Sequence, residues 1–328
     1  MIGVGIAGCG FGASHHGKTI TEEYPDKFKL VAFCDLNKER LEQTCNKFGV
    51  KGYQDFTGFL EDKEISLVII ATRPHSTHFS LAIKALKTGK DVVVEKPFCI
   101  TSEEARELLK TKDETKRVLT IHQNRRWDVD YLNVKQVMEE GRLGKLKLIK
   151  NYYPASLGEV DVLYEWGSHL IDQVLRLVGG LPERVFGILS HPENNWDGQG
   201  FFSAQLIYPD GLMVEVSAVP QAKPFLLPRF YLLGTKGSLT HDWVQRREDT
   251  MLKHIYFNSE KGMDFDFFRP QYYQTYPWKI LTFYENLYDA ITEGKQLSVK
   301  PEEGLETILV MEGIIESARS NKPIPLKV

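Results

Sequence analysis

The chain opens with Ile2-Gly3-Val4-Gly5-Ile6-Ala7-Gly8-Cys9-Gly10-Phe11-Gly12-Ala13, and its fold class can be worked out from these residues. The first six residues form a short apolar run, which is typical of a buried strand. In the G-x-G-x-x-A pattern that follows, Gly8 makes a tight turn, Gly10 lets a pyrophosphate approach the backbone, and Ala13 lets a helix pack closely. The stretch predicts a dinucleotide at a helix N-terminus, where free amides and the helix dipole favour phosphate.

Further strands and helices alternate after this turn. Apolar runs at 29–35, 67–71, 91–95 and 118–122 predict strands, and amphipathic stretches at 38–48, 76–88 and 102–112 predict helices. The last helix opens with a Thr101-Ser102-Glu103-Glu104 capping box. Such alternation predicts a doubly wound parallel sheet, so we expect residues 1–122 to form an α/β dinucleotide-binding (Rossmann) domain.

Asp35 ends the second predicted strand, 22 residues after Ala13. Its carboxylate can accept hydrogen bonds from a ribose hydroxyl and would repel a 2′-phosphate, so the sequence favours NAD over NADP. Lys38 and Arg40 lie close enough to leave NADP possible. Asp35 also suits the N-cap of the helix that begins near Asn37, and the two roles are compatible.

The second half has a different periodicity. Helices are expected at 129–140, 163–178, 280–292 and 301–320, and alternating strands at 184–189, 200–208, 212–219 and 229–233. The pattern predicts an α+β domain over residues 123–328, with a largely antiparallel open sheet covered by helices on one face. The apolar residues Phe201, Phe202, Val214, Val216 and Phe230 fit either an oligomer contact on the other face or the core.

Composition narrows the class of protein. A chain of 328 residues is long enough for two domains, and a net charge of −3 with scattered basic residues argues against nucleic-acid binding. The four cysteines lack the spacing of a zinc site or a disulfide framework. The sequence contains no apolar run of about 20 residues and no export signal at its start, so we expect a cytoplasmic protein that does not bind membranes.

Three more segments carry a resemblance to a known family. They are Ile70-Ala71-Thr72-Arg73-Pro74-His75-Ser76-Thr77-His78, Val94-Glu95-Lys96-Pro97-Phe98, and Tyr164-Glu165-Trp166-Gly167-Ser168-His169-Leu170-Ile171-Asp172. With the glycine loop, they resemble the family of glucose-fructose oxidoreductase and inositol dehydrogenase (Gfo/Idh/MocA) from residue 2 to about residue 180. Residues 123–127 and 234–238 are most similar to its scyllo-inositol dehydrogenase-like branch.

The resemblance implies an NAD-dependent oxidoreductase that moves a hydride to or from a secondary alcohol of a sugar or polyol. We also expect a homo-oligomer, either a dimer or a tetramer, and no metal, because hydride transfer between these partners does not require one. Lys96 is then the catalytic lysine and works with His169 in proton transfer. The implied cofactor contacts are Gly8, Gly10, Phe11, Gly12, Asp35, Thr72, Pro74, His75, His78, Glu95 and Lys96. The implied substrate contacts are Asn124, Arg125, Arg126, Trp127 and His169.

Lys96 and the helix around His169 can also be interpreted without the family. Pro97 restricts Lys96 to extended geometry at the carboxyl end of a strand, although a lysine there can equally be a surface residue. Glu165, His169, Asp172 and Arg176 share one helix face, which places an imidazole one turn from two carboxylates and suits acid–base catalysis. A solvated polar face has the same spacing. Glu165 stands where the family commonly has Asp, which leaves Asp172 as a second candidate partner of His169.

Other histidines and the arginines have weaker signals. His75 and His78 form an H-x-x-H without a carboxylate ligand, which favours loop and cap residues near the cofactor over metal ligands. His15 and His16 fit either a helix surface or a substrate contact. Arg125 and Arg126 are followed by Asp128 and Asp130, which can neutralise them, so a neutral polyhydroxylated substrate is favoured over a carboxylate. The two arginines fit either the lining of the substrate pocket or a structural role.

Two other functions fit the same residues. One is a regulatory protein that senses NAD and a sugar without turnover, and the other is a sugar–sugar oxidoreductase with a permanently held cofactor.

Overall fold

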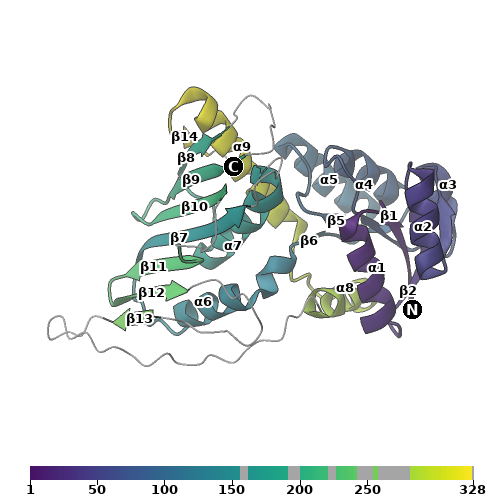
Figure 1. The fold of residues 1–328 in the computed structure, drawn as a ribbon, viewed down its shortest axis with the longest axis horizontal. Coiled ribbons are helices and arrows are strands. Elements are labelled where there is room, and N and C mark those ends of the chain that lie inside the picture. The colour runs from purple at the N-terminus through teal and green to yellow at the C-terminus, as the bar shows by residue number, and fades with distance from the viewer. Residues whose placement is uncertain (156–161, 191–199, 221–226, 242–253, 258–280, 327–328) are drawn as a thin grey trace. The chain divides into compact units, whose positions relative to one another are not determined.

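The chain forms two compact units in the computed structural model, which describes residues 1–155, 162–190, 200–220, 227–241, 254–257 and 281–326 (Figure 1). Unit 1 comprises Met1–Gln123 and Ile280–Ile308, and unit 2 comprises Asn124–Lys279 and Leu309–Val328. Residues 280–308, which the sequence patterns place with the second domain, therefore belong to the same unit as the Rossmann sheet.

Unit 1 is built on a sheet of six parallel strands in the order β3-β2-β1-β4-β5-β6. The strands are β1 (Ile2–Ala7), β2 (Phe28–Cys34), β3 (Lys51–Tyr53), β4 (Leu67–Ile70), β5 (Asp91–Glu95) and β6 (Leu119–His122). This is the doubly wound order, which confirms the predicted Rossmann class. The strand order reverses between β1 and β4, so the ligand-binding crevice is expected beyond the carboxyl ends of these two strands.

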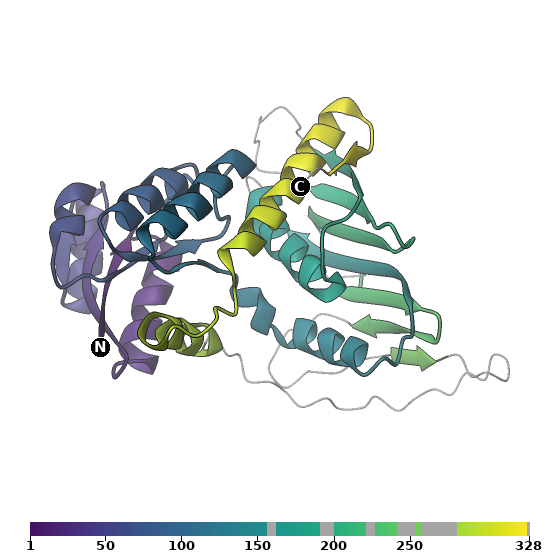
Figure 2. The same cartoon turned by 180° about the vertical axis from the view of Figure 1, so that it is seen from behind.

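Six helices of the described chain lie wholly in unit 1, and α9 (Pro301–Ser320) begins there. The six are α1 (Phe11–Glu23), α2 (Lys38–Phe48), α3 (Phe56–Glu61), α4 (Thr77–Lys87), α5 (Ser102–Thr115) and α8 (Leu281–Glu293). The capping box of α5 is confirmed, because Glu104 N donates to Thr101 Oγ1 at 3.2 Å and the Glu104 side chain accepts from the Thr101 amide. Figures 1 and 2 both show α4 and α5 side by side.

The turn after β1 accepts only glycine. Gly8 has φ of +102°, and a Cβ at this position would lie 2.4 Å from the carbonyl oxygen of Ala71. Its amide donates to the carbonyl of Cys34 at 2.7 Å, which ties the turn to the end of β2. The close approach of β1, β2 and β4 therefore depends on the missing side chain.

Helix α8 packs beside α1, as both views show (Figures 1 and 2). Tyr284 is 1% exposed, and its ring centroid lies 5.7 Å from that of Tyr24 and 5.8 Å from that of Phe28. Further along, Thr120 Oγ1 on β6 donates to the carbonyl of Val299 at 2.7 Å. These contacts are made by residues far apart in sequence, and they place 280–308 in unit 1.

Unit 2 contains an eight-stranded sheet in the order β13-β12-β11-β7-β10-β9-β8-β14. Among the pairings described, only β7 with β10 is parallel, so the prediction of a largely antiparallel sheet is confirmed. The strands are β7 (Leu146–Ala155), β8 (Arg184–Leu189), β9 (Phe202–Ile207), β10 (Met213–Pro220), β11 (Phe230–Gly234), β12 (Gly237–His241), β13 (His254–Phe257) and β14 (Ile324–Pro325).

Helices of unit 2 cover one face of this sheet. They are the 3₁₀-helix η1 (Asn124–Trp127), α6 (Val129–Glu139), the π-helix η2 (Leu163–Gly167), α7 (Ser168–Val178) and the later part of α9 (Pro301–Ser320). Asn151 Nδ2 on β7 donates to the carbonyl of Leu170 on α7 at 3.2 Å, and a Cβ at Gly187 on β8 would lie 2.8 Å from Ile314 of α9. No helix within the described ranges is long and apolar enough to cross a membrane.

The two faces of the sheet differ in polarity. Phe202, Val214, Val216 and Phe230 are all 0% exposed, so they form the core under the helices and are not available for an oligomer contact. The opposite face carries polar pairs: Glu215 accepts from Lys150 Nζ at 2.8 Å and from Tyr152 Oη at 2.9 Å, while Ser203 and Ser217 are 2.8 Å apart. The homo-oligomer remains a prediction, and these four apolar residues do not support it.

We predict that Gly8→Ala destabilises unit 1 by clearly more than Gly49→Ala. Gly49 also has a positive φ, +67°, but its Cβ position has nothing within 4 Å, so its variant carries backbone strain without a clash. Ala at a positive-φ site costs more than ~1 kcal/mol, and the Gly8 variant adds the contact with Ala71. Denaturant unfolding of both variants measures the difference, and equal losses would contradict the role of the contact.

Candidate active site

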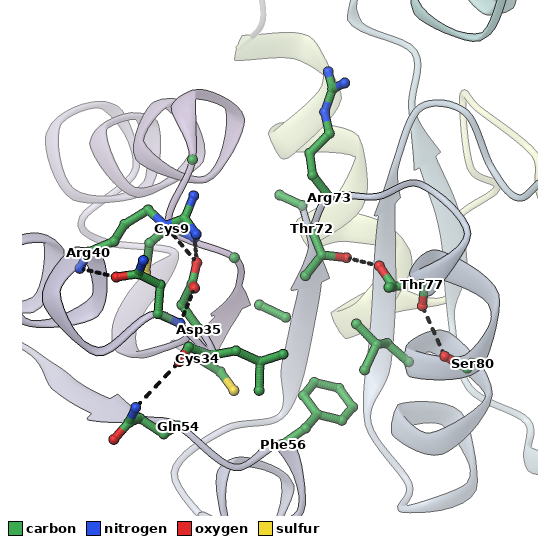
Figure 3. Close-up of a pocket in the computed structure, with 17 residues that line it drawn as sticks. Cys9, Cys34, Asp35, Arg40, Gln54, Phe56, Thr72, Arg73, Thr77 and Ser80 are labelled. Atoms are coloured by element: carbon green, nitrogen blue, oxygen red, sulfur yellow. Dashed lines mark hydrogen bonds and ion pairs between the residues drawn. The ribbon is translucent and has the colours of Figure 1, made fainter. Parts of the chain in front are cut away.

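A cavity of about 560 Å³ opens at the carboxyl ends of β1, β2 and β4 in unit 1 (Figure 3). Its walls include four of the predicted cofactor contacts: Gly8, Gly10, Asp35 and Thr72. The other predicted contacts, Phe11, Gly12, Pro74, His75, His78, Glu95 and Lys96, lie outside its lining. The cavity occupies the switch point at which a doubly wound sheet binds its ligand.

The glycine loop of this cavity fits a pyrophosphate. A Cβ at Gly10 would have nothing within 4 Å, so the backbone is open to a ligand there. Gly10 is also the N-cap of α1, and this helix has neither a side-chain cap nor an acidic residue in its first turn. The first amides of α1 can therefore bind an anion, as the sequence predicts. Phe11 is 93% exposed beside them.

Asp35 is held rigidly at the edge of the cavity. Its Oδ2 accepts from the amide of Cys9 at 2.9 Å and its Oδ1 from the amide of Asn37 at 2.8 Å. The cap of α2 is Asn37, whose side chain accepts from Arg40 N, so the N-cap role considered for Asp35 is wrong. Arg40 Nε lies 3.5 Å from Asp35 Oδ2 and also lines the cavity, which places a cation beside this carboxylate.

Several residues of the cavity wall were not predicted. They are Leu36, Asn37, Gln54 and Phe56 among others. Leu36 is 88% exposed. It directly follows Asp35 at the end of a predicted strand, and this position would have indicated it as a residue of the cavity wall. Gln54 and Phe56 follow the short strand β3, for which the sequence gives no clear signal.

His78 joins the loops that follow β4 and β5. It is 1% exposed, its Nδ1 lies 2.8 Å from the carbonyl of Pro97, and its Nε2 lies 3.1 Å from that of Thr72. Burial lowers the pKa of His78, although both of its ring nitrogens face backbone carbonyl oxygens. The ring thereby fixes the loop that carries Lys96. Helix α4 begins at Thr77, so His75 and Pro74 lie in the loop ahead of it.

Lys96 lies between Glu95, the last residue of β5, and Pro97. Its amide donates to Glu95 Oε2 at 3.1 Å. Glu95 Oε1 lies 2.8 Å from His16 Nε2 and 2.8 Å from His122 Nδ1. This cluster was not predicted: His16 is 0% exposed, which excludes the helix-surface position considered for it, and nothing in the sequence connects it to β5 or β6.

Unit 2 holds the other predicted catalytic residues. His169 and Asp172 lie on α7 and are 5% and 2% exposed, so the polar face of this helix is buried and not solvated. Glu165 lies in the π-helix η2, whose wider turn changes its direction relative to α7. Asp172 is paired with Arg126: Nε to Oδ2 is 2.8 Å and Nη2 to Oδ1 is 2.5 Å.

The ion-pair partners of the η1 arginines differ in part from those predicted from the sequence. Arg125 Nη1 does pair with Asp128, at 2.9 Å. Arg126 pairs with Asp172, however, and Asp130 Oδ2 lies 3.0 Å from Arg229 Nε, at the start of β11. Asn124 and Trp127 complete the same 3₁₀-helix.

An aromatic pair lies next to Arg125 and His169. The rings of Tyr153 and Trp166 stack with centroids 3.7 Å apart, and the Arg125 guanidinium lies 5.2 Å and 4.9 Å from them. The Trp166 and His169 ring centroids are 6.4 Å apart. Tyr152, one residue earlier, points to the opposite face of the sheet, where it bonds Glu215.

Comparison with known proteins identifies the family. Residues 2–123 match the model of the GFO_IDH_MocA oxidoreductase family, NAD-binding Rossmann fold, and residues 156–326 match that of its C-terminal alpha/beta domain. The chain belongs to this oxidoreductase family. It is an NAD(P)-dependent oxidoreductase.

Similar proteins cover the whole chain. The scyllo-inositol 2-dehydrogenase (NADP(+)) IolW of Bacillus subtilis is 27% identical over 99% of this chain and 96% of its own length. The scyllo-inositol 2-dehydrogenase (NAD(+)) of the same organism is 26% identical over 98% and 96%. A putative oxidoreductase from Klebsiella pneumoniae has a similar structure, with a TM-score of 0.86, 28% identity, and coverage of 100% of this chain and 95% of that one.

We predict that the family member described here binds NAD(H) more tightly than NADP(H), and that Asp35→Ser narrows the difference by about tenfold or more, because a charged hydrogen-bond acceptor is lost and the repulsion of a 2′-phosphate is removed. Titration of both cofactors into both proteins measures this. Glu39→Ser is the control, because Glu39 is a carboxylate in the first turn of α2 that does not line the cavity. Tighter NADP(H) binding by the unmodified protein would contradict the prediction.

Proposed function

We propose that this dehydrogenase uses NAD to interconvert a secondary alcohol and a ketone on a neutral polyhydroxylated ring, such as an inositol or a pyranose sugar. The observation that carries the proposal is the alignment with two scyllo-inositol 2-dehydrogenases over nearly the full length of all three chains. The cavity, the glycine loop and the Glu95-Lys96-Pro97 segment supply what such a reaction requires in unit 1.

The charges of unit 2 support a neutral substrate. Recognition of a carboxylate requires an arginine whose fork can bind it in a bidentate way. Arg125, Arg126 and Arg229 each form an ion pair with an aspartate of the same unit. Their charges are already balanced, so these three residues favour hydroxyl groups over an anion.

The side chains near His169 support a ring. Trp166 and Tyr153 present a stacked aromatic surface, and His169 lies beside Trp166. An apolar surface next to a few polar groups is typical of small-molecule sites, in which the polar groups fix orientation. A polyhydroxylated ring offers both an apolar face and several donors and acceptors.

The proton chemistry falls to Lys96 and His169. A bound nicotinamide dinucleotide supplies the hydride acceptor. As the substrate C–H bond breaks, the hydroxyl must lose its proton, and an amine or imidazole within hydrogen-bond reach can accept it. In the reverse direction the same groups return the proton to the carbonyl oxygen. We assign Asp172 a positioning role, because both of its carboxylate oxygens accept bonds from Arg126.

We predict that Lys96→Ala and His169→Ala each lower kcat by about 10²- to 10⁴-fold, as loss of a positioned general acid or base does. Cofactor affinity, measured by calorimetry, should change little, because neither residue lines the adenosine cavity. Lys87→Ala, at the exposed end of α4, is the matched control for loss of a lysine. Near-normal kcat in either variant would remove that residue from the mechanism.

We predict that a substrate screen following NADH absorbance gives the highest kcat/KM with an inositol or a pyranose. 2-Hydroxy acids and hydrophobic secondary alcohols serve as the contrasting classes. A clearly higher value for either class would overturn the proposal. Gel filtration before the screen separates two modes of turnover: cofactor that stays with the protein would favour a sugar–sugar oxidoreductase over exchange with free NAD.

A further inference from the structure

Glu95 is the centre of a buried polar cluster at the carboxyl ends of β5 and β6. We define the Glu95 cluster as His16, Glu95, His122 and Tyr284. His16 and His122 are 0% and 2% exposed, and each points a ring nitrogen at Glu95 Oε1 from 2.8 Å. Tyr284 Oη forms a hydrogen bond with His16 Nδ1.

The hydrogen bonds determine where the protons are. Burial and the charge of Glu95 raise the pKa of Tyr284 well above its usual range, so its hydroxyl keeps the proton and donates to His16 Nδ1. His16 Nε2 then carries the ring proton and donates to Glu95. Burial lowers the pKa of His16, in agreement with a neutral ring.

The surroundings of His122 place its ring proton on Nδ1. Its Nδ1 carries the proton that Glu95 accepts, which leaves Nε2 as a lone pair. Within the part of the chain that the structure describes, Nε2 has no hydrogen-bond partner, and the ring packs edge-on against Phe283 with centroids 4.9 Å apart. A buried lone pair is tolerated there more easily than a buried N–H.

The geometry of the Glu95 cluster favours hydrogen bonds over a bound metal ion. Three potential ligand atoms, His16 Nε2, Glu95 Oε1 and His122 Nδ1, lie within 4.8 Å of one another. The nitrogen–oxygen contacts of 2.8 Å are hydrogen-bond lengths. A metal on His122 Nδ1 would move the ring proton to Nε2, which meets no acceptor among the described residues.

Glu95 is therefore an ionised carboxylate held by neutral donors. Burial alone would raise its pKa, but the two histidines that face it, His122 and His16, bring the pKa of Glu95 well below its usual range. The amide of Lys96 is a third donor, at 3.1 Å. The net charge of the Glu95 cluster is thus negative.

This charge lies in the half of the sheet that receives the nicotinamide. A doubly wound sheet binds the two halves of a dinucleotide on either side of the switch point. Asp35 and its cavity mark the adenosine side, at β2, so the nicotinamide side is that of β5 and β6. Glu95 also faces the glycine loop: a Cβ at Gly12 would lie 3.9 Å from Glu95 Oε1.

We propose that Glu95 is a fixed counter-charge that makes the protein bind oxidised, cationic NAD in preference to NADH. The nicotinamide ring carries a positive charge before it accepts a hydride and none afterwards. A carboxylate that cannot move away stabilises the first form only. Bound NADH consequently becomes a stronger hydride donor, which favours reduction of a ketone on the protein.

The test compares dissociation constants of NAD and NADH for the unmodified protein and Glu95→Gln, measured by calorimetry without substrate. We expect the ratio Kd(NAD)/Kd(NADH) to rise about tenfold in the variant, as loss of one partly screened charge interaction would cause. Asp91→Asn is the matched control, because Asp91 is a carboxylate at the opposite end of β5 and should leave the ratio unchanged. An unchanged ratio in Glu95→Gln overturns the proposal.

Two further measurements keep the test decisive. If Glu95→Gln does not fold, Glu95→Met combined with His122→Phe removes the charge together with one of its donors, and the same rise in the ratio is expected. One equivalent of zinc or another divalent metal in the purified protein, measured by mass spectrometry, would overturn the proposal in favour of a metal site. Binding needs no substrate, so a failed substrate screen would contradict the proposed ring substrate and leave this proposal standing.

Discussion

Gly8 can lie against Ala71 only because it has no side chain, and the positions of the residues around the cavity in unit 1 depend on that contact. The same turn bonds Cys34 through its amide, and the next amide, of Cys9, fixes the carboxylate of Asp35. Because all six strands are parallel, their carboxyl ends share one edge of the sheet. The cavity at the ends of β1, β2 and β4 and the carboxylate of Glu95 on β5 therefore lie along the same edge as this turn.

Unit 2 depends on a different constraint, which is the cost of burying arginine. Arg229 is 1% exposed and lies between Asp130, at 3.0 Å, and the side-chain oxygen of Gln173, at 2.5 Å. Removing one partner of such a pair costs roughly 3–5 kcal/mol, since the other charge stays buried. The pairs link α6 to the start of β11 and, through Arg126 and Asp172, η1 to α7. The second pair holds α7, which carries His169, against η1.

The helices and strands were predictable where the inward face of the element carries only apolar residues. Strand β7 was missed because its inward face includes Asn151, a buried amide bonded to Leu170, which breaks the alternation. The Rossmann loop and Asp35 follow from spacing alone. The Glu95 cluster does not, because His16 and Tyr284 are 268 residues apart and a buried histidine has no sequence signature. The pairing of Arg126 with Asp172 was also missed, because Asp130, which is nearer in the sequence, forms its ion pair with Arg229.

The two units treat charge in opposite ways, and this has a consequence for selectivity. Unit 1 holds the carboxylate of Glu95 with neutral imidazoles, so its charge remains available to act on a ligand. Unit 2 pairs three arginines with aspartates, so their charges largely cancel. A substrate site built on these paired arginines would distinguish neutral substrates by hydrogen bonds and shape, and a buried donor left without its hydroxyl would penalise the wrong substrate strongly. Discrimination by charge is then expected for the cofactor, and discrimination by hydroxyl geometry for the substrate, so substitutions in unit 2 can change the substrate while the sheet of unit 1 stays the same.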